Sequence, residues 1–369
     1  MNNDNLTNRH DILLLFEVTN GNPNGDPDAG NMPRLEPNSS RGLVSDVCLK
    51  RKIRNFICDF EKERQRDNSG NGYSIMVRQG AVLNREIAQA LQAIAPGLPP
   101  KPPKKNKREA FDWEQKAAEV AIKWMCREFY DVRAFGAVLS TGKEDKSSAA
   151  SEAEQADSDK KAVNDLKGLL SGSAWGQVRG PVQFTFGQSY HPITPIEITV
   201  TRCAVTKEED ASKERTMGHK HIVPYALYFA KAYVSPAFAE RTGFTNADLT
   251  LLFDALNNLF THDHSAARGD MIVRGIYDFE HVGTQHPNNG DQNKREARLG
   301  CAHAHVLFDG VEIRLKKKKN ADGTETAIEA PQSITDYDIV NQWENKALPT
   351  GVKLHLRHEN PVRTFSASS

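Results

Sequence analysis

The stretch Asn20-Gly21-Asn22-Pro23-Asn24-Gly25-Asp26-Pro27 separates two segments of different character near the start of the chain. Before it, residues 11–18 (DILLLFEV) form a short apolar run bounded by turn residues, which predicts a buried strand. The prolines and Asn-Gly steps of the quoted stretch forbid regular structure. After it, residues 41–60 predict a helix, because one face collects the apolar side chains Leu49, Ile53, Phe56, Ile57 and Phe60.

The chain has no formal net charge, but its basic and acidic residues are unevenly distributed along the sequence. The 369 residues contain 48 Lys and Arg against 48 Asp and Glu. Residues 41–54 nevertheless hold five basic residues and one acid, and residues 101–108 hold five basic residues and no acid. Residues 316–319 are all lysine. Local basic patches of this kind can bind phosphate even when the net charge is zero.

The cysteine, histidine and motif patterns argue against several classes of protein. The five cysteines are an odd number without a Cys-x-x-Cys pair, which fits a reducing cytoplasm. No catalytic motif such as Gly-x-Ser-x-Gly or a Walker loop occurs, and no apolar run approaches the roughly 18 residues of a membrane span. Three His-x-His pairs lack a third metal ligand at a recognised spacing: His219/His221, His262/His264 and His303/His305. We therefore expect a cytoplasmic protein without catalytic residues, cofactor, metal or membrane contact.

The remaining pattern predicts an α+β protein with segments inserted between core elements. Helices are expected at residues 84–95, 111–129 and 245–260, the last with Thr245 and Asp248 at capping-box spacing. Residues 195–205 and 222–234 predict the two arms of a long hairpin with a charged tip at 207–215. Further strands are expected at 271–279, 302–308 and 352–357. Residues 143–161 are rich in Ser, Ala and mixed charge, so we expect a flexible insertion that can be deleted without loss of folding.

The loop and the helix that follows it allow two interpretations. A basic helix directly after an amide-rich loop can offer its N-terminal amides and its Lys and Arg side chains to phosphates, without reading bases. Alternatively, residues 22–27 are only a stiff connector. The spacing of the residues does not decide between these two interpretations.

Taken with other segments, the loop and helix closely resemble the backbone subunit of type I CRISPR surveillance complexes. The resemblance is to the Csd/Csh-type branch of the seventh Cas protein family, and is strongest to subtype I-C. Beside residues 22–27 and 42–54, the matching segments run in the expected order from about residue 10 to 310: Asp131-Val132-Arg133-Ala134-Phe135-Gly136, Arg179-Gly180-Pro181-Val182-Gln183, Arg215-Thr216-Met217-Gly218-His219-Lys220 and Ser265-Ala266-Ala267-Arg268-Gly269-Asp270-Met271.

The resemblance implies a fold shaped like a hand. Its palm is an RRM-like (ferredoxin-like) sheet with helices, its fingers are an inserted helical region, and its thumb is a long β-hairpin. Transferred to this chain, the palm comprises residues 1–70, 131–200 and 226–369, the fingers 71–130 and the thumb 201–225. The stretches at 99–108, 143–161 and 316–326 depart from the family pattern and receive no function.

The resemblance also implies a non-catalytic subunit that polymerises along one guide RNA in a Cascade complex. Each thumb would reach over the neighbouring palm and displace one guide base, and the other bases would stay available to pair with target DNA. The implied partners are guide RNA, target DNA through the guide, further copies of the chain and other Cascade subunits. The residues expected to contact RNA are Asn24, Arg41, Lys50, Arg51, Arg54, Arg179 and Gln183 in the palm, and Met217, His219 and Lys220 in the thumb.

An RNA endonuclease is the alternative function. Related backbone subunits of type III complexes cleave target RNA with an aspartate in a palm loop, and Asp26 lies in such a loop. A cleavage assay on labelled RNA, with and without metal ions, distinguishes this function from passive binding.

Overall fold

The computed structural model describes residues 4–61, 64–100, 102, 106–140, 174–201, 203–204, 217–319 and 323–358. The chain forms two compact units, each of which is assembled from separated segments. Unit 1 contains residues 1–6, 54–182 and 236–250, and unit 2 contains residues 7–53, 183–235 and 251–369. The predicted flexible insertion at 143–161 and the charged hairpin tip at 207–215 lie outside the described residues.

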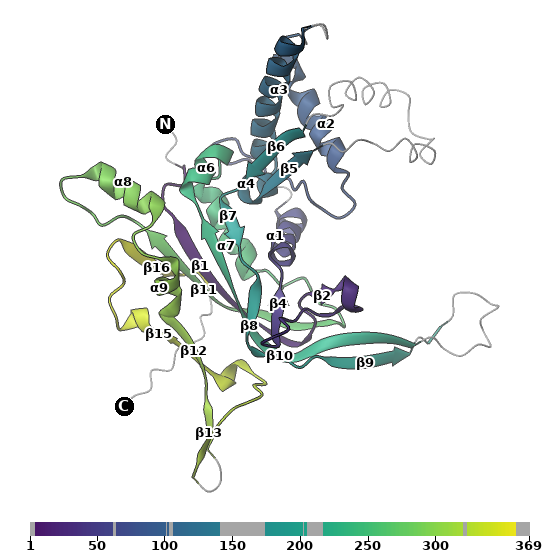
Figure 1. Ribbon diagram of the computed structural model, residues 1–369, viewed down its shortest axis with the longest axis vertical. Coiled ribbons are helices and arrows are strands. Elements are labelled where there is room, and N and C mark those ends of the chain that lie inside the picture. The colour runs from purple at the N-terminus through teal and green to yellow at the C-terminus, as the bar shows by residue number, and fades with distance from the viewer. Residues whose placement is uncertain are drawn as a thin grey trace. The chain divides into compact units, whose positions relative to one another are not determined.

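The elements follow one another in an α+β order, as the sequence predicts (Figure 1). The helices are α1 (Asp46–Phe60), α2 (Leu83–Ile94), α3 (Lys107–Glu128), α4 (Tyr130–Phe135), α6 (Pro236–Thr242), α7 (Asn246–Asn257), α8 (Gly290–Leu299) and α9 (Ala304–Asp309). The strands on the main path of the largest sheet, together with β9, are β1 (His10–Gly21), β4 (Arg41–Val44), β8 (Gly187–Pro192), β9 (Ile196–Thr201), β10 (Met217–Val234), β11 (Arg268–His281) and β16 (Val352–Leu356). The other strands are β2 (Gly25–Asp26), β3 (Met32–Pro33), β5 (Gly136–Ser140), β6 (Ala174–Arg179), β7 (Val182–Phe184), β12 (Val311–Leu315), β13 (Lys317–Lys319), β14 (Glu325–Ala327) and β15 (Tyr337–Asn341).

A large antiparallel sheet forms the centre of unit 2, with the strand order β16-β11-β1-β10-β8-β4 (Figure 1). The first strand of the chain lies between β11 and β10, where Leu14 is opposite Ile276 and Ala230. Because β1 has a neighbour on both edges and side chains buried on both faces, its sequence reads as a continuous apolar run. The predicted buried strand at residues 11–18 is therefore confirmed.

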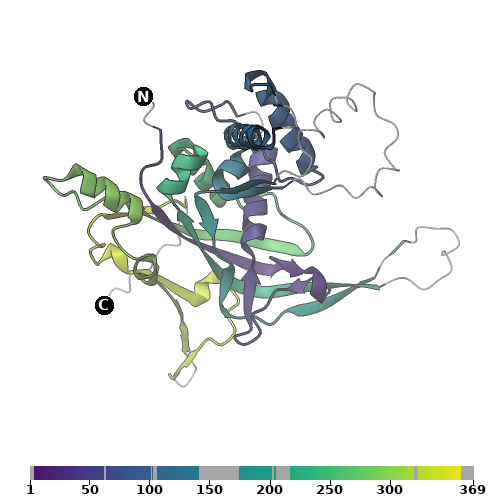
Figure 2. The same ribbon diagram turned by 45° about the horizontal axis from the view of Figure 1, so that its top comes forward.

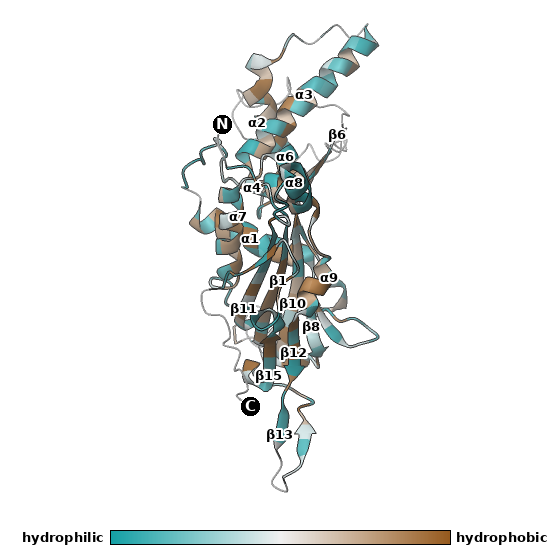
Figure 3. Ribbon diagram, turned by 90° about the vertical axis from the view of Figure 1, so that its left-hand side faces the viewer, coloured by the Kyte–Doolittle hydropathy of each residue, from teal (hydrophilic) through white to brown (hydrophobic). Residues whose placement is uncertain are grey.

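Apolar side chains pack on both faces of this sheet, and Figure 3 shows hydrophobic residues along β1. On one face, Leu13 and Leu15 belong to a cluster completed by α9 and by the β12–β15 ribbon. On the other face, the Phe16 ring lies 5.3 Å from the rings of both Tyr228 and Phe260. The strand predicted at residues 302–308 is wrong, because Leu307 and Phe308 of helix α9 pack onto the sheet surface and do not join its edge.

The hairpin of unit 2 combines β9 with the first part of β10 (Figure 2). Met217 is opposite Thr201, and the pairing continues to Ile222 opposite Ile196. Every residue of β9 is exposed, whereas β10 runs on for 18 residues and becomes buried where it joins the central sheet. The predicted hairpin arms are therefore confirmed as far as residues 201 and 217.

Helices α2 and α3 and the β5–β6 hairpin surround the core of unit 1. Ile87, Leu91 and Ile94 of α2 pack with Ala121 and Met125 of α3 in one buried cluster. The helices predicted at 84–95 and 111–129 are both confirmed, although α3 begins four residues earlier than predicted. Helix α4 follows α3 directly, and strand β5 follows α4.

A buried ion pair joins helix α4 to the start of α7 within unit 1. Arg133 donates from Nε and Nη2 to the two carboxylate oxygens of Asp248, at 2.9 and 2.7 Å, and neither side chain is exposed. Asp248 also accepts from the backbone N of Thr245, while the Thr245 hydroxyl accepts from the Asp248 N. The predicted capping box is therefore formed, and its carboxylate holds a buried arginine as well.

Candidate nucleic-acid interface

Helix α1 begins later than predicted, and this changes the position of Arg41. Residues 41–44 form strand β4, and the helix starts at Asp46 after Ser45. The Gly42 N donates to the Ser189 hydroxyl at 2.8 Å, and a Cβ at Gly42 would lie 2.3 Å from the Tyr228 hydroxyl. These contacts hold residue 42 against the sheet of unit 2. Arg41 therefore projects from a strand, not from the basic helix.

The loop of residues 22–27 is tied to the first turn of α1. The Asn24 Oδ1 accepts from the Ser45 backbone N at 2.8 Å and from the Ser45 hydroxyl at 2.9 Å. The Cys48 thiol lies 3.5 Å from the Pro23 carbonyl oxygen, to which it donates. The side-chain oxygen of Asn24 is thus occupied inside the protein, where it fixes the entry into the helix.

The same loop is tied to the turn of residues 263–269. The Asn22 N donates to the Ala267 carbonyl oxygen, and the Asn22 Nδ2 donates to the Asn31 carbonyl oxygen, each at 2.7 Å. Gly269 follows this turn in close contact with the chain, since a Cβ there would lie 2.6 Å from the Thr19 carbonyl oxygen. We call the loop 22–27, the first two turns of α1 and the turn 263–269 the loop–helix corner.

The predicted cations of the loop–helix corner differ in their surroundings. Lys50 forms an ion pair with Asp46 one turn earlier, at 2.9 Å, and is only 12 % exposed. Arg51 is exposed and has no ion pair with any side chain that the structure describes. Of the two, Arg51 is therefore the one whose guanidinium remains available to a phosphate.

Arg54, which belongs to unit 1, is held by the protein itself. Its Nε donates to the Asp131 carboxylate at 3.0 Å, and its guanidinium lies 5.2 Å from the centre of the Phe135 ring. Asp131 is 1 % exposed and accepts backbone hydrogen bonds from Met76 and Val77 as well. The contact of Arg54 with RNA stays a prediction.

Arg41 keeps a cationic group at the edge of the sheet in unit 2. It is half-buried, and among the described side chains none forms an ion pair with it. Burial lowers the pKa of His191, and the nearby charge of Arg41 lowers it further. Arg41 therefore remains a candidate phosphate contact, although it acts from β4.

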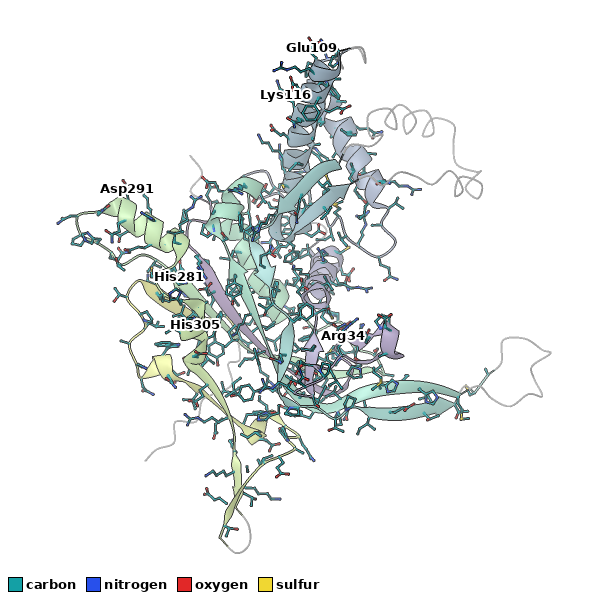
Figure 4. The ribbon with its side chains drawn as sticks, viewed as in Figure 1. Arg34, Glu109, Lys116, His281, Asp291 and His305 are labelled. Carbon is teal, nitrogen blue, oxygen red and sulfur yellow. The ribbon has the colours of Figure 1, made fainter. Side chains whose placement is uncertain are left out.

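Three basic residues of unit 2 were missed by sequence reasoning. Lys52 is 7 % exposed and forms an ion pair with Asp263, whose second oxygen binds Arg268 at 2.5 Å. Arg34, which is labelled in Figure 4, forms an ion pair with Asp26 at 3.3 Å. A signal for Lys52 exists in the sequence, because it lies three residues after Leu49 and so falls on the buried face of the helix. The partners of Arg34 and Arg268 carry no such local signal.

The predicted thumb residues occupy the two faces of the exposed hairpin. Met217 is 65 % exposed and shares a face with His219, which forms an ion pair with Glu197 at 2.6 Å. Lys220 is opposite Ile198 on the other face and forms no ion pair within the described chain. Met217 and Lys220 are therefore available for contacts outside the subunit, whereas His219 is engaged.

Arg179 and Gln183 belong to different units. Arg179 is exposed, and its guanidinium lies 4.5 Å from the centre of the Phe238 ring in unit 1. Gln183 is half-buried in unit 2. Their contact with RNA stays a prediction.

The described residues contain no group of three His, Cys, Asp or Glu side chains that could hold a metal ion. The rings of His303 and His305 stack on each other at 5.7 Å, and His219 pairs with Glu197. Burial raises the pKa of Cys126 to about 11. None of the helices in the described ranges combines the length and apolarity needed to cross a membrane.

An α+β protein with exposed cations beside an amide-rich loop is suited to holding a phosphate backbone. A family model described as CRISPR-associated protein Cas7 matches residues 8–342. The chain therefore belongs to the Cas7 family.

The chain is also similar to one relative in sequence and to two solved chains. A CRISPR-associated protein Cas7 from Haloferax volcanii is 26 % identical over 260 residues, which are 69 % of this chain and 66 % of that relative. The chain thus spans slightly less than two thirds of the relative's length. Two solved chains titled as CRISPR RNA-guided surveillance complexes, one of them pre-nicking, share 15 % and 14 % identity, each with a TM-score of 0.36. They cover 79 % and 73 % of this chain and 76 % and 78 % of their own.

Proposed function

We propose that this chain is a non-catalytic subunit that binds CRISPR guide RNA and polymerises along it in a Cascade complex. The observation that carries the proposal is the Cas7 family match over residues 8–342. In this role the chain presents the guide for pairing with target DNA, together with further copies of itself and other Cascade subunits. Such a protein works in the cytoplasm.

The chemistry of the surface supports a grip on the RNA backbone. Arg41, Arg51 and Lys220 offer cations with which no described carboxylate forms an ion pair. Cations contact phosphate without reading sequence, which suits a subunit that must accept every guide. We propose these three residues as the main contacts. The further candidates Asn24, Lys50, Arg54, Arg179, Gln183, Met217 and His219 have contacts inside the protein or stand on the hairpin.

The same proposal assigns the palm, the fingers and the thumb to elements of this chain. We assign the central sheet of unit 2 to an RRM-like palm, the region of α2 and α3 to the fingers, and the β9–β10 hairpin to the thumb. We assign the chain to subtype I-C, the subtype that its matching sequence segments resemble most.

Guide binding is favoured over RNA cleavage by the surroundings of Asp26. The Asp26 carboxylate accepts from the Asp28 N at 3.3 Å and forms an ion pair with Arg34. The Asp26 carboxylate is thus already engaged in stabilising the turn that begins at this residue. A nuclease needs a carboxylate that can hold a metal ion or move a proton.

The proposal is tested with purified protein and two labelled single-stranded RNAs of equal length and unrelated sequence. We expect both RNAs to bind with the same affinity and the same dependence on salt, and to remain intact in the presence of Mg²⁺. Binding of only one sequence, or cleavage that the Asp26→Asn variant abolishes, contradicts the proposal.

A further inference from the structure

The carboxylate of Asp263 lies between two cations that differ in their access to solvent. Lys52 Nζ contacts one oxygen and is 7 % exposed, while Arg268 Nη1 contacts the other at 2.5 Å and is 48 % exposed. Lys52 also lies 5.3 Å from the centre of the Phe260 ring, so it points into the protein. Of the two cations, only Arg268 can reach a ligand.

Arg268 is held firmly at this position. Its backbone N donates to the Ser265 carbonyl oxygen at 2.9 Å, and the Ser265 N donates to the Arg268 carbonyl oxygen at 3.0 Å. It is also opposite Gly21 in the pairing of β11 with β1. The backbone of Arg268 is therefore fixed in a hydrogen-bonded turn beside the loop of residues 22–27, and the ion pair with Asp263 directs its guanidinium.

The charges around the Cys48 thiol show that this corner is cationic. Burial raises the pKa of Cys48, and Lys52, Arg268 and Arg51 oppose that rise, while Asp263 adds to it. Three cations and one carboxylate thus surround a single side chain of the first turn of α1. Over the whole loop–helix corner, four Lys and Arg side chains stand against three Asp side chains, an excess of one positive charge. This excess lies beside a loop whose Asn24 and Pro23 oxygens are already occupied.

We propose that Arg268 binds a phosphodiester group of the guide-RNA backbone, and that buried Lys52 makes this possible by neutralising Asp263. The proposal rests on the function proposed above and adds a contact to it. The Arg268 Nη1 is used by Asp263, whereas its Nε and Nη2 donate to nothing in the described ranges. A guanidinium can hold one carboxylate and one phosphate through different edges.

Lys52 acts as a positioning residue in this account. Without it, Arg268 would be the one cation of the described residues that pairs with Asp263, and the pair would be electrically neutral. A neutral pair attracts a phosphate far less than a carboxylate shared by two cations does. A buried lysine that never touches RNA should therefore influence RNA affinity.

The test measures the affinity of the full chain for a fluorescein-labelled single-stranded RNA at several salt concentrations. We expect Arg268→Ala to weaken binding about tenfold and to lower the slope of log K against log salt by about 0.7.

Lys52→Met should weaken binding in the wild-type background and have no further effect in the Arg268→Ala background. Lys52→Met combined with Asp263→Asn should restore affinity, because Arg268 then has no carboxylate to neutralise. Arg295→Ala, an exposed arginine on α8, is the matched control and should leave binding unchanged.

The outcomes separate this inference from the proposed function. If the wild-type protein binds no RNA, both are wrong. If the wild type binds but Arg268→Ala keeps its affinity and its salt slope, only the assignment of Arg268 is overturned. If Lys52→Met lowers RNA affinity by the same factor in the wild-type and in the Arg268→Ala background, the proposed role of Lys52 is overturned. An Arg268→Ala variant with altered oligomer size and unaltered RNA affinity points to an acidic protein partner and also contradicts the proposal.

Discussion

Asp131 accepts a hydrogen bond from Arg54 Nε at 3.0 Å and is 1 % exposed. The same carboxylate accepts from the backbone N of Met76 at 2.9 Å and of Val77 at 3.0 Å. Arg54 thus supplies the counter-charge to a buried carboxylate that organises the chain before α2. This contact gives Arg54 a role in stability that is separate from any contact with RNA.

Replacing Arg54 by Ala should destabilise unit 1. The change leaves the Asp131 carboxylate buried with two backbone donors but no cation, which costs about 1–3 kcal/mol of unfolding free energy. Urea unfolding of Arg54→Ala and of Arg51→Ala measures the difference. Unchanged stability of Arg54→Ala would show that the pair with Asp131 contributes little.

Replacing Arg51 by Ala should affect RNA binding without affecting stability. Arg51 is exposed and has no ion pair within the described residues, so its removal leaves no buried charge behind. Loss of one phosphate contact lowers the slope of log K against log salt by about 0.7 on single-stranded RNA. The slope should fall equally for unrelated RNA sequences, with Arg295→Ala as the control. A loss confined to one sequence would rule out a grip on the backbone alone.

The local elements of the chain could be predicted because their signals are local. The apolar run of β1, the periodicity of α2 and α3 and the spacing of Thr245 and Asp248 each lie within one short segment. The start of α1 could not be placed in this way. Residue 42 is held in β4 by Ser189 and Tyr228, which are more than 140 positions away in the sequence.

The same limit applies to the candidate interface. The sequence shows that Lys50, Arg51 and Arg54 are basic, but not that Arg54 pairs with Asp131. It also does not show that Lys52 and Arg268 share Asp263. Basic residues are recognised from the sequence, whereas their neutralisation by distant carboxylates requires the fold.

Burial of Cys126 should make stability depend on pH in the alkaline range. Its pKa is raised from 9.0 to about 11, so the folded state keeps the thiol neutral while the unfolded state begins to ionise near pH 9. The stability that the neutral Cys126 thiol contributes is therefore fully present below pH 9, and about 2 kcal/mol of it is lost as the pH rises towards 11. Cys126→Ala should lack this component.

Urea unfolding at pH 8 and at pH 11 measures this effect. Cys203→Ala is the control, because Cys203 is exposed and its removal should leave the pH dependence of the wild type in place. Parallel losses of stability in the wild type and in Cys126→Ala would contradict the burial of this thiol.

Shortening the β9–β10 hairpin should impair assembly and spare folding. Every residue of β9 is exposed, and the Met217 side chain on β10 is 65 % exposed, so the ribbon buries little within its own subunit. Removing residues 207–219 should leave the melting temperature close to that of the wild type and reduce the size of the oligomer formed on RNA. A lower melting temperature with full assembly would mean that the hairpin only completes the sheet.

The mass of the protein on guide RNAs of increasing length tests polymerisation along the guide most directly. Mass photometry of the full chain without RNA should give one subunit of 41.1 kDa. With RNA, the mass should rise in steps of one subunit as the RNA is lengthened, independently of its sequence. A mass that stays constant as the RNA is lengthened would contradict the account.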